Sequence, residues 1–536
     1  MKRRDLLKAA SALTAAGWSG LPLQALAAQQ TLHYLPGSEA FDYTWLKGLA
    51  RHLSSRAYIP PSNVLPDAIK ALDWYSYAAI RFRDDQALWA PPQLDDSPFR
   101  IKLFHLGHLF RTPVRIYELN GGRARELAYD TAMFDYGNSG VDATKLPDDL
   151  GFAGFRIHAK PEWDRDATSF LGASYFRAIG DRFQFGMSAR GLMIDGGLLS
   201  PEEFPRFSRF WLARPTTSNN TGSNTLILYA LLESPSISGA YRFVIHYEGT
   251  RQLMDIDAAL YPRKAIERLG IAPLTSMFQY GENDRRADND WRPEIHDSDG
   301  LAMQRGNGEW LWRPLTNPPR LHFSSYADEN PRGFGLMQRD RDFKHYQDDS
   351  MFYESRPSAW VEPKGNWGKG SVQLIELTAP DETFDNIVAY WNPAVAAKPG
   401  QEMLYSYRLH WSGAPDVQTP LAHVVSTYTG PGGLIGQNIV GKRRDFVSWR
   451  FVVDFNGGTL PNHHAGGIHP IINASRGGID LVSLHWIEET NNWRTQFDFR
   501  PDDGEAPTEL RLVLQDDQGN PLSETWLYQW SPPPRP

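Results

Sequence analysis

The sequence predicts a mainly β protein that folds as a large N-terminal β-sandwich followed by a smaller C-terminal one. Apolar and polar residues alternate along many segments, as in Tyr241–Tyr247, and this period of two is typical of strands. The chain has 45 glycines, 39 prolines and 12% aromatic residues, a composition that favours short strands joined by turns. With 536 residues it exceeds the size of one ordinary hydrophobic core, so we expect two domains.

One amphipathic helix is expected near the start of the mature chain. Phe41, Trp45, Leu49 and Leu53 recur four residues apart and would share one face of that helix. After residue 72 no segment keeps a helical period for three turns. We therefore expect strands and loops in the rest of the chain.

From about residue 101 the pattern changes to that of strands. A hairpin turn is expected at Asn120-Gly121, a dipeptide that tolerates the positive φ angles of a type I′ turn. Residues 372–377 and 387–391 would be the two strands of a hairpin around a loop at residues 381–385. Further strands are predicted at residues 154–158, 183–187, 226–232, 241–247 and 403–411.

The boundary between the two sandwiches is placed at residues 413–422, where Gly and Pro interrupt the strand pattern. The large domain would span residues 28–412 and the second domain residues 423–536. The second domain has the size of one immunoglobulin-like sandwich. Its strands are predicted at residues 448–455, 493–499, 510–514 and 525–530.

Residues 1–27 are expected to be a leader that is removed on export. Arg3-Arg4 in a basic start, a weakly apolar run and the small-x-small site Ala25-Leu26-Ala27 form a twin-arginine signal peptide. The apolar run is too short and too polar to span a membrane. Its removal takes away four basic residues and one acid, so the net charge of −8 becomes −11. These features predict the periplasm as the destination.

The composition excludes several partners and chemistries. A chain without cysteine has no thiol nucleophile, thiolate zinc site or iron–sulfur cluster. The acidic net charge offers no basic face for phosphates, so no nucleic-acid partner is expected. Asp297-Ser298-Asp299-Gly300 matches only part of a calcium loop, and His463-His464 lacks a third ligand at metal spacing. We therefore predict neither a metal nor a cofactor.

The stretch from Glu282 to Asp385 interleaves carboxylates with flat aromatic rings and turns. Rings stack on the apolar faces of sugars, and carboxylates handle hydroxyls and glycosidic oxygens, so this pattern suits a sugar-binding cleft. Trp291, Trp360 and Trp367 are the candidate stacking residues. The alternative, which composition alone favours, is a set of solvated acidic loops with core tryptophans.

Glycoside hydrolysis requires one protonated carboxyl group at the leaving oxygen and a carboxylate that activates water or attacks carbon. The candidates are Asp297, Asp299, Glu382 and Asp385. Asp385 has apolar neighbours, which favour a protonated acid, whereas Asp297 and Asp299 lie in a wetter Ser/Gly turn that suits an ionised base. Equally, the two turn aspartates could do no more than bond their own backbone.

Five stretches of the chain resemble the periplasmic glucan biosynthesis (OpgG/OpgD) family. They are residues 174–178, 296–304, 343–357, 360–370 and 381–391, which are spread over most of the mature chain. The resemblance implies a galactose-mutarotase-like β-sandwich joined by a short linker to an immunoglobulin-like domain. It also implies a role in making osmoregulated periplasmic glucans, whose backbone is β-1,2-linked glucose.

For the branch of the family with a twin-arginine leader, the resemblance implies an endo-β-1,2-glucanase that inverts the anomeric centre. Asp385 matches its general acid. Asp297 matches its base, which acts on water through a relay that includes a substrate hydroxyl, and Asp299 stays open as the alternative base. The predicted substrate-binding residues are Glu382, Tyr353, Arg356, Asp299, His296, Trp291, Trp360 and Trp367.

The expected partner is β-1,2-glucan, with a membrane glucan synthase as a second partner and a homodimer as an open oligomeric state. Two alternatives to hydrolysis are kept. A non-catalytic glucan-binding protein would assist export or modification of the nascent polymer. An epimerase or mutarotase would change anomers without shortening a chain.

Overall fold

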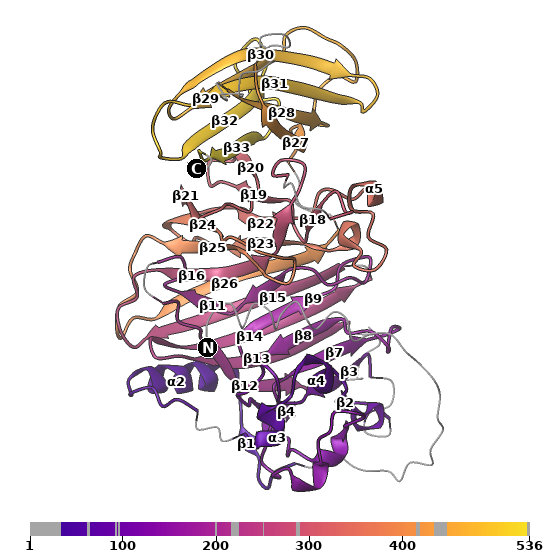
Figure 1. Cartoon of the computed structure of the whole chain (residues 1–536). Coiled ribbons are helices and arrows are strands. Elements are labelled where there is room, and N and C mark those ends of the chain that lie inside the picture. The colour runs from indigo at the N-terminus through magenta and orange to yellow at the C-terminus, as the bar shows by residue number, and fades with distance from the viewer. Residues whose placement is uncertain are drawn as a thin grey trace.

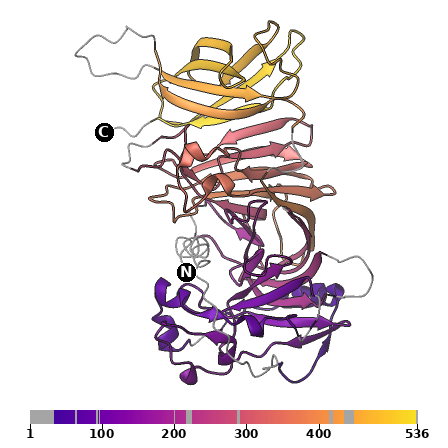
Figure 2. The same ribbon diagram turned by 90° about the vertical axis from the view of Figure 1, so that its right-hand side faces the viewer.

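The computed structural model describes residues 34–532 apart from 62–64, 92–93, 95–96, 199–200, 216–223, 250, 286–289, 414–418 and 434–447. It is mainly β, as the sequence predicts (Figure 1). The predicted leader lies outside the described residues. Helices α2, α3 and α4 lie near one end of the molecule and the C-terminal strands at the other end (Figures 1 and 2).

One large sheet runs through most of the molecule. Its strands, in spatial order, are β1 (Glu39–Ala40), β5 (Arg123–Glu126), β4 (Arg115–Asn120), β12 (Arg206–Ala213), β13 (Thr225–Glu233), β14 (Ile237–Glu248), β15 (Arg251–Pro262), β26 (Met403–Ser412), β23 (Ser358–Lys364), β22 (Gly333–Met337), β19 (Gly300–Gln304), β20 (Trp310–Pro314), β33 (Thr525–Trp530), β32 (Thr508–Gln515) and β29 (His469–Ala474). The last three belong to the C-terminal part of the chain and join through a parallel pairing of Leu311 with Thr525.

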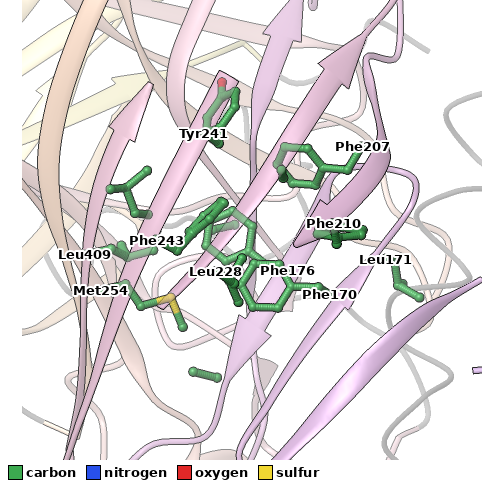
Figure 3. Packing of buried hydrophobic residues seen from close by; sticks show 14 of the residues in the cluster. Phe170, Leu171, Phe176, Phe207, Phe210, Leu228, Tyr241, Phe243, Met254 and Leu409 are labelled. Atoms are coloured by element: carbon green, nitrogen blue, oxygen red, sulfur yellow. The ribbon is translucent and has the colours of Figure 1, made fainter. Parts of the chain in front are cut away.

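A second sheet packs against the first. Its order is β21 (His322–Glu329), β24 (Lys369–Glu376), β25 (Ile387–Pro393), β16 (Leu269–Ser276), β10 (Ser188–Arg190), β9 (Tyr175–Ala178), β8 (Thr168–Leu171), β7 (Gly154–Ala159) and β3 (Phe99–Phe104), with β11 (Leu192–Ile194) on β16. Phe170 and Phe176 of this sheet lie 5.2 and 5.3 Å from Phe243 of the first, ring centre to ring centre (Figure 3). The main core therefore lies between two sheets, as in a sandwich.

The C-terminal strands form a second pair of layers. The sheet β27 (His423–Pro431), β28 (Trp449–Asn456), β31 (Asn492–Arg500) and β30 (Gly478–Ile487) faces β33, with Phe451 packed on Trp526. This core also contains Trp310, Trp312 and Trp360 from the larger part of the chain. The large sheet and the C-terminal layers thus share one apolar cluster. The domain boundary itself stays a prediction, since residues 414–418 lie outside the described part of the chain.

Short helices and small ladders complete the fold. The helices are α2 (Tyr43–Ser54), α3 (Asp67–Lys70), α4 (Trp74–Ala78) and α5 (Phe343–Tyr346), with 3-10 turns η2 (Asp84–Gln86), η3 (Thr131–Met133), η4 (Ala143–Lys145) and η5 (Tyr353–Ser355). The ladders are β2 (Arg81–Phe82) with β6 (Phe134–Asp135) and β17 (Phe278–Tyr280) with β18 (Ile295–His296). Helix α2 begins after Asp42, whose carboxylate accepts from Trp45 N at 2.7 Å.

Three local predictions need correction. The buried face of α2 centres on Leu46 and Ala50, whereas Trp45 is 40% exposed. The hairpin turn lies one residue later than predicted, because Gly121 and Gly122 both have positive φ and Asn120 pairs as the last residue of β4. Residues 183–187 form no strand, since Phe183 has φ 58° and the strand begins at Ser188.

Candidate active site

Asp297 lies in a turn that is bonded to the end of β16. The turn follows β18 and leads into β19. The Asp297 backbone N–H donates to the Met277 carbonyl at 2.8 Å, and the hydroxyls of Ser298 and Ser276 are 2.8 Å apart. The predicted turn therefore exists, but it is held by the neighbouring strand as well as by its own backbone.

The Asp297 carboxylate forms an ion pair with Arg356, 59 residues away in the chain. The two residues are only 5% and 7% exposed. Burial opposes the charge on Arg356, but the Asp297 carboxylate outweighs it and raises the pKa of Arg356. The Arg356 guanidinium also lies over the Tyr353 ring, 4.1 Å from its centre. The buried Asp297 carboxylate is therefore held in place, and its charge is balanced by that of Arg356.

Glu382 is held by two groups from separate segments. Its Oε2 accepts from the Tyr353 hydroxyl at 3.0 Å and from Arg292 Nη1 at 2.5 Å. Arg292 also binds Asp348 at 3.1 Å and Asp290 through two contacts. The predicted residues Tyr353, Arg356 and Glu382 thus lie in one network. Arg292 completes that network and was not predicted from sequence.

Asp385 stands at the end of the loop before β25 and is 6% exposed. The loop is closed by a bond from Leu377 N to Asn386 O at 2.8 Å. The Asn386 side chain accepts from Phe278 N and donates to Phe278 O, both at 2.9 Å. Since Phe278 pairs with His296 across β17 and β18, Asn386 connects the loop that carries Asp385 to the strand that precedes Asp297.

Arg177 is a buried cation on which the charges of both Asp297 and Asp385 act. Burial lowers its pKa to about 10, while the charges of Asp385, Asp166 and Asp297 act in the opposite direction. The charges of the two predicted catalytic carboxylates therefore both act on one guanidinium group. Arg177 is 4% exposed, and its Nη2 has no hydrogen-bond partner among the described residues. A small cavity of about 10 Å³ lies beside it, lined by Ser169, Leu171, Tyr175, Phe176, Arg177 and Ser188.

His296 carries a proton on each ring nitrogen, as its bonds require. The Gln338 side-chain nitrogen donates to two carbonyls, those of His296 and Tyr353, so its oxygen must accept the bond from His296 Nδ1 at 2.9 Å. Nε2 lies 3.1 Å from the Glu294 carboxylate, which accepts. Burial would lower the pKa of His296, but the bond to Glu294 raises it to about 9.

His296 and Asp299 are structural in this arrangement. His296 is fully buried and both of its ring nitrogens bond protein side chains, so it has no nitrogen left to contact a substrate, contrary to the prediction. Asp299 Oδ2 accepts from the backbone N–H groups of Arg339 and Asp340 at 3.0 and 2.9 Å. Its burial raises the pKa of that carboxyl group. Asp299 therefore fixes the neighbouring loop, which favours Asp297 between the two candidate bases.

The predicted tryptophans divide into two kinds. Trp291 is 65% exposed, lies beside Arg292 and stays available for stacking. Trp360 is 1% exposed and stacks on Trp310 in the C-terminal core. Trp367 is 7% exposed and packs on Tyr405 in the main core. The prediction that Trp360 and Trp367 stack on sugar is wrong, because their rings are covered by protein.

One group of side chains has the geometry of a metal site. Glu294, Asp340 and His345 place potential ligand atoms within 4.8 Å of one another. In this arrangement His345 Nδ1 lies 2.7 Å from Asp340 Oδ2, and that bond raises the pKa of His345 to about 9. A hydrogen bond between the His345 ring and the Asp340 carboxylate therefore accounts for the contact between these two residues.

Buried carboxylates, guanidinium groups and an exposed tryptophan on a β-sandwich suit a protein that handles carbohydrate. Residues 41–530 match the family model described as periplasmic glucan biosynthesis protein, MdoG. The chain belongs to this family. It is accordingly a periplasmic protein with a role in glucan biosynthesis. Within the described residues no helix has the length and apolarity needed to cross a membrane.

Curated relatives agree with that assignment. The chain is 54% identical to "Glucans biosynthesis protein D" of Xanthomonas campestris over 540 residues, which covers 100% of this chain and 99% of the relative. It is 54% identical over 501 residues to "Probable glucans biosynthesis protein D" of Shewanella oneidensis, covering 93% and 90%. A galactose mutarotase related enzyme from Lactobacillus acidophilus has a TM-score of 0.19 at 8% identity, over 45% of this chain and 96% of that one, too low to carry an argument.

Proposed function

We propose that this protein is a periplasmic hydrolase that cleaves internal bonds of β-1,2-glucan with inversion and so controls the length of the glucan backbone. The observation that supports the proposal is that the charges of Asp297 and Asp385 both act on the buried guanidinium of Arg177. The two residues lie 88 positions apart in the chain, and Asn386 connects their loops through its bonds to Phe278. An inverting hydrolase needs two such groups on opposite sides of the scissile bond.

In this reaction Asp385 donates its proton to the glycosidic oxygen as the bond to the anomeric carbon breaks. A water molecule attacks that carbon from the opposite face. Asp297 takes up the proton of the water through a relay that includes a substrate hydroxyl. Arg356 supports this role, because its guanidinium forms an ion pair with the Asp297 carboxylate and holds that carboxylate in place.

The remaining residues would bind and orient the sugar. Glu382 and Arg292 offer a carboxylate and a guanidinium at the partly exposed side of the network. Trp291 offers an open ring for stacking on a glucose face. A glucan synthase in the membrane would supply the polymer, and the products would be shorter β-1,2-glucans.

The test is to incubate the purified protein with linear β-1,2-glucan and to measure hydrolysis as the appearance of new reducing ends. Wild-type protein should shorten the polymer, while Asp385→Asn and Asp297→Asn should each lose at least about a hundredfold in rate, as expected when a general acid or base is removed. Asp381→Asn is the matched control. Asp381 lies on the same loop as Asp385, is exposed and accepts from Thr383 N at 3.0 Å.

Three outcomes discriminate among the candidates. Activity of Asp385→Asn near the wild-type rate would remove Asp385 from the role of acid. Binding of the glucan without new reducing ends in the wild type would favour the non-catalytic glucan-binding protein. A change in anomer ratio without shortening would favour a mutarotase.

A further inference from the structure

Residues 338–341, which follow β22, form hydrogen bonds with the chain segments on both sides of the Asp297–Arg356 ion pair. The Gln338 side chain bonds the ring and the carbonyl of His296, the residue before Asp297. It also donates to the Tyr353 carbonyl at 3.0 Å. Arg341 donates to the Arg356 carbonyl at 2.6 Å. We call these four residues the 338–341 segment.

The 338–341 segment is fastened to the C-terminal part of the chain by a buried ion pair. Arg339 meets Glu524 through two contacts of 2.5 and 3.1 Å. Glu524 is fully buried and also accepts from Val424 N at 2.8 Å. The Arg339 guanidinium lies over the Trp312 ring, 3.7 Å from its centre. Both charges are therefore paired, and the guanidinium has little freedom to move.

A second series of hydrogen bonds connects the C-terminal strand β27 to the loop that carries Asp385. The Thr429 hydroxyl of β27 donates to the Asn283 carbonyl at 2.8 Å. The next residue, Asp284, accepts from Asn317 N at 2.7 Å. The Asn317 side chain donates to the Ala379 carbonyl at 3.0 Å and accepts from Ala379 N at 2.8 Å. Ala379 lies at the start of the loop that ends in Asp385, so C-terminal strands contact the supports of both carboxylates.

We propose that Glu524 is a positioning residue of the hydrolytic site, and that the C-terminal part of the chain sets the geometry of the Asp297–Arg356 pair through Arg339. The inference rests on the proposed function. Glu524 itself contacts no reacting atom. It acts by fixing the backbone of the 338–341 segment, whose side chains and N–H groups hold the loops at residues 296–299 and 353–356.

Glu524→Gln and Asp454→Asn are the variants that test this inference. Asp454 is the matched control, because it is 2% exposed and forms a two-contact ion pair with Arg494, at 2.7 and 2.8 Å, within the four-stranded C-terminal sheet. Each change keeps the shape of the side chain and removes one buried charge. Glu524→Asp, which keeps the charge, is the conservative variant.

The first measurement is amide hydrogen exchange, which needs no activity. Glu524→Gln should speed exchange at least about tenfold in the 338–341 segment and at residues 296–299, while Asp454→Asn should leave those amides unchanged. Glu524→Asp should restore much of the protection. Equal exchange in Glu524→Gln and wild type would overturn the inference, whether or not the protein hydrolyses glucan.

The second measurement is hydrolysis of β-1,2-glucan. Glu524→Gln should lower kcat by about 10- to 100-fold with KM within about twofold, because the reacting groups are displaced while the binding surface persists. Asp454→Asn should keep both constants. An unchanged kcat in Glu524→Gln beside an active wild type would refute the positioning role, whereas an inactive wild type would refute the proposed function. If Glu524→Gln does not fold, Arg339→Lys replaces it with the same expected results.

Discussion

Raising the pH from 6.5 to about 9 should destabilise the folded protein, because His296 keeps a proton in the folded state that it loses in the unfolded state. The ring is enclosed by Glu294 and Gln338, and although burial opposes the charge, the bond to Glu294 raises the pKa from 6.5 to about 9. In the unfolded chain the ring titrates near 6.5. Between these values the folded state holds one proton more than the unfolded state. Linkage then requires that stability falls as the pH rises through this window.

The size of the effect follows from the two pKa values. A rise from 6.5 to about 9 corresponds to about 3 kcal/mol of unfolding free energy. This contribution is fully present below pH 6.5, falls by about 1.4 kcal/mol per pH unit through the window, and is lost above pH 9. Because His296 is fully buried, solvent does not screen its interaction with Glu294.

The assay is urea unfolding at several pH values between about 6 and about 9.5. The difference in unfolding free energy between wild type and His296→Gln isolates this group from all others that titrate. That difference should shrink as the pH rises. His469→Gln is the control for the loss of an imidazole, since His469 and its partner Asp517 are both exposed. Parallel pH profiles for wild type and His296→Gln would refute the assignment of the buried proton.

Three further changes test the packing and the site. Gly300→Ala should cost about 1–3 kcal/mol, because the new methyl group would overlap the Trp312 ring; thermal unfolding measures the loss. Glu376→Leu should cost about 3–5 kcal/mol, because it leaves the fully buried Arg313 without its carboxylate partner, and urea unfolding should show it. Trp291→Ala should leave stability unchanged within about 0.5 kcal/mol and weaken β-1,2-glucan binding, measured by calorimetry.

The alternation of apolar and polar residues predicts most of the strands in the two sheets. It fails where a strand is buried on both faces. Strand β16 is buried along its whole length and contains Pro273, a residue that normally argues against a central strand. Pro273 is tolerated because the pairing shifts register between Ile271 and Leu274, so no ladder bond is required of its missing N–H.

For the site, residue types could be predicted from the sequence, but partners could not. A lone arginine within an apolar strand, such as Arg177 in β9, signals a buried counter-charge without indicating which carboxylate supplies it. The pairing of Asp297 with Arg356 depends on the closure of two loops. Trp360 and Trp367 look the same as Trp291 in a linear pattern, since exposure is decided by packing between sheets far apart in sequence.

The parallel pairing of β20 with β33 has a consequence for shortened forms of the protein. A chain cut after Ser412 would lose β33 and leave the backbone groups of β20 open along one edge. Trp310, Trp312 and Trp360, now covered by the C-terminal strands, would meet water at the same place. An open strand edge beside exposed indole rings is a template for aggregation, so the N-terminal portion should self-associate when it is produced alone.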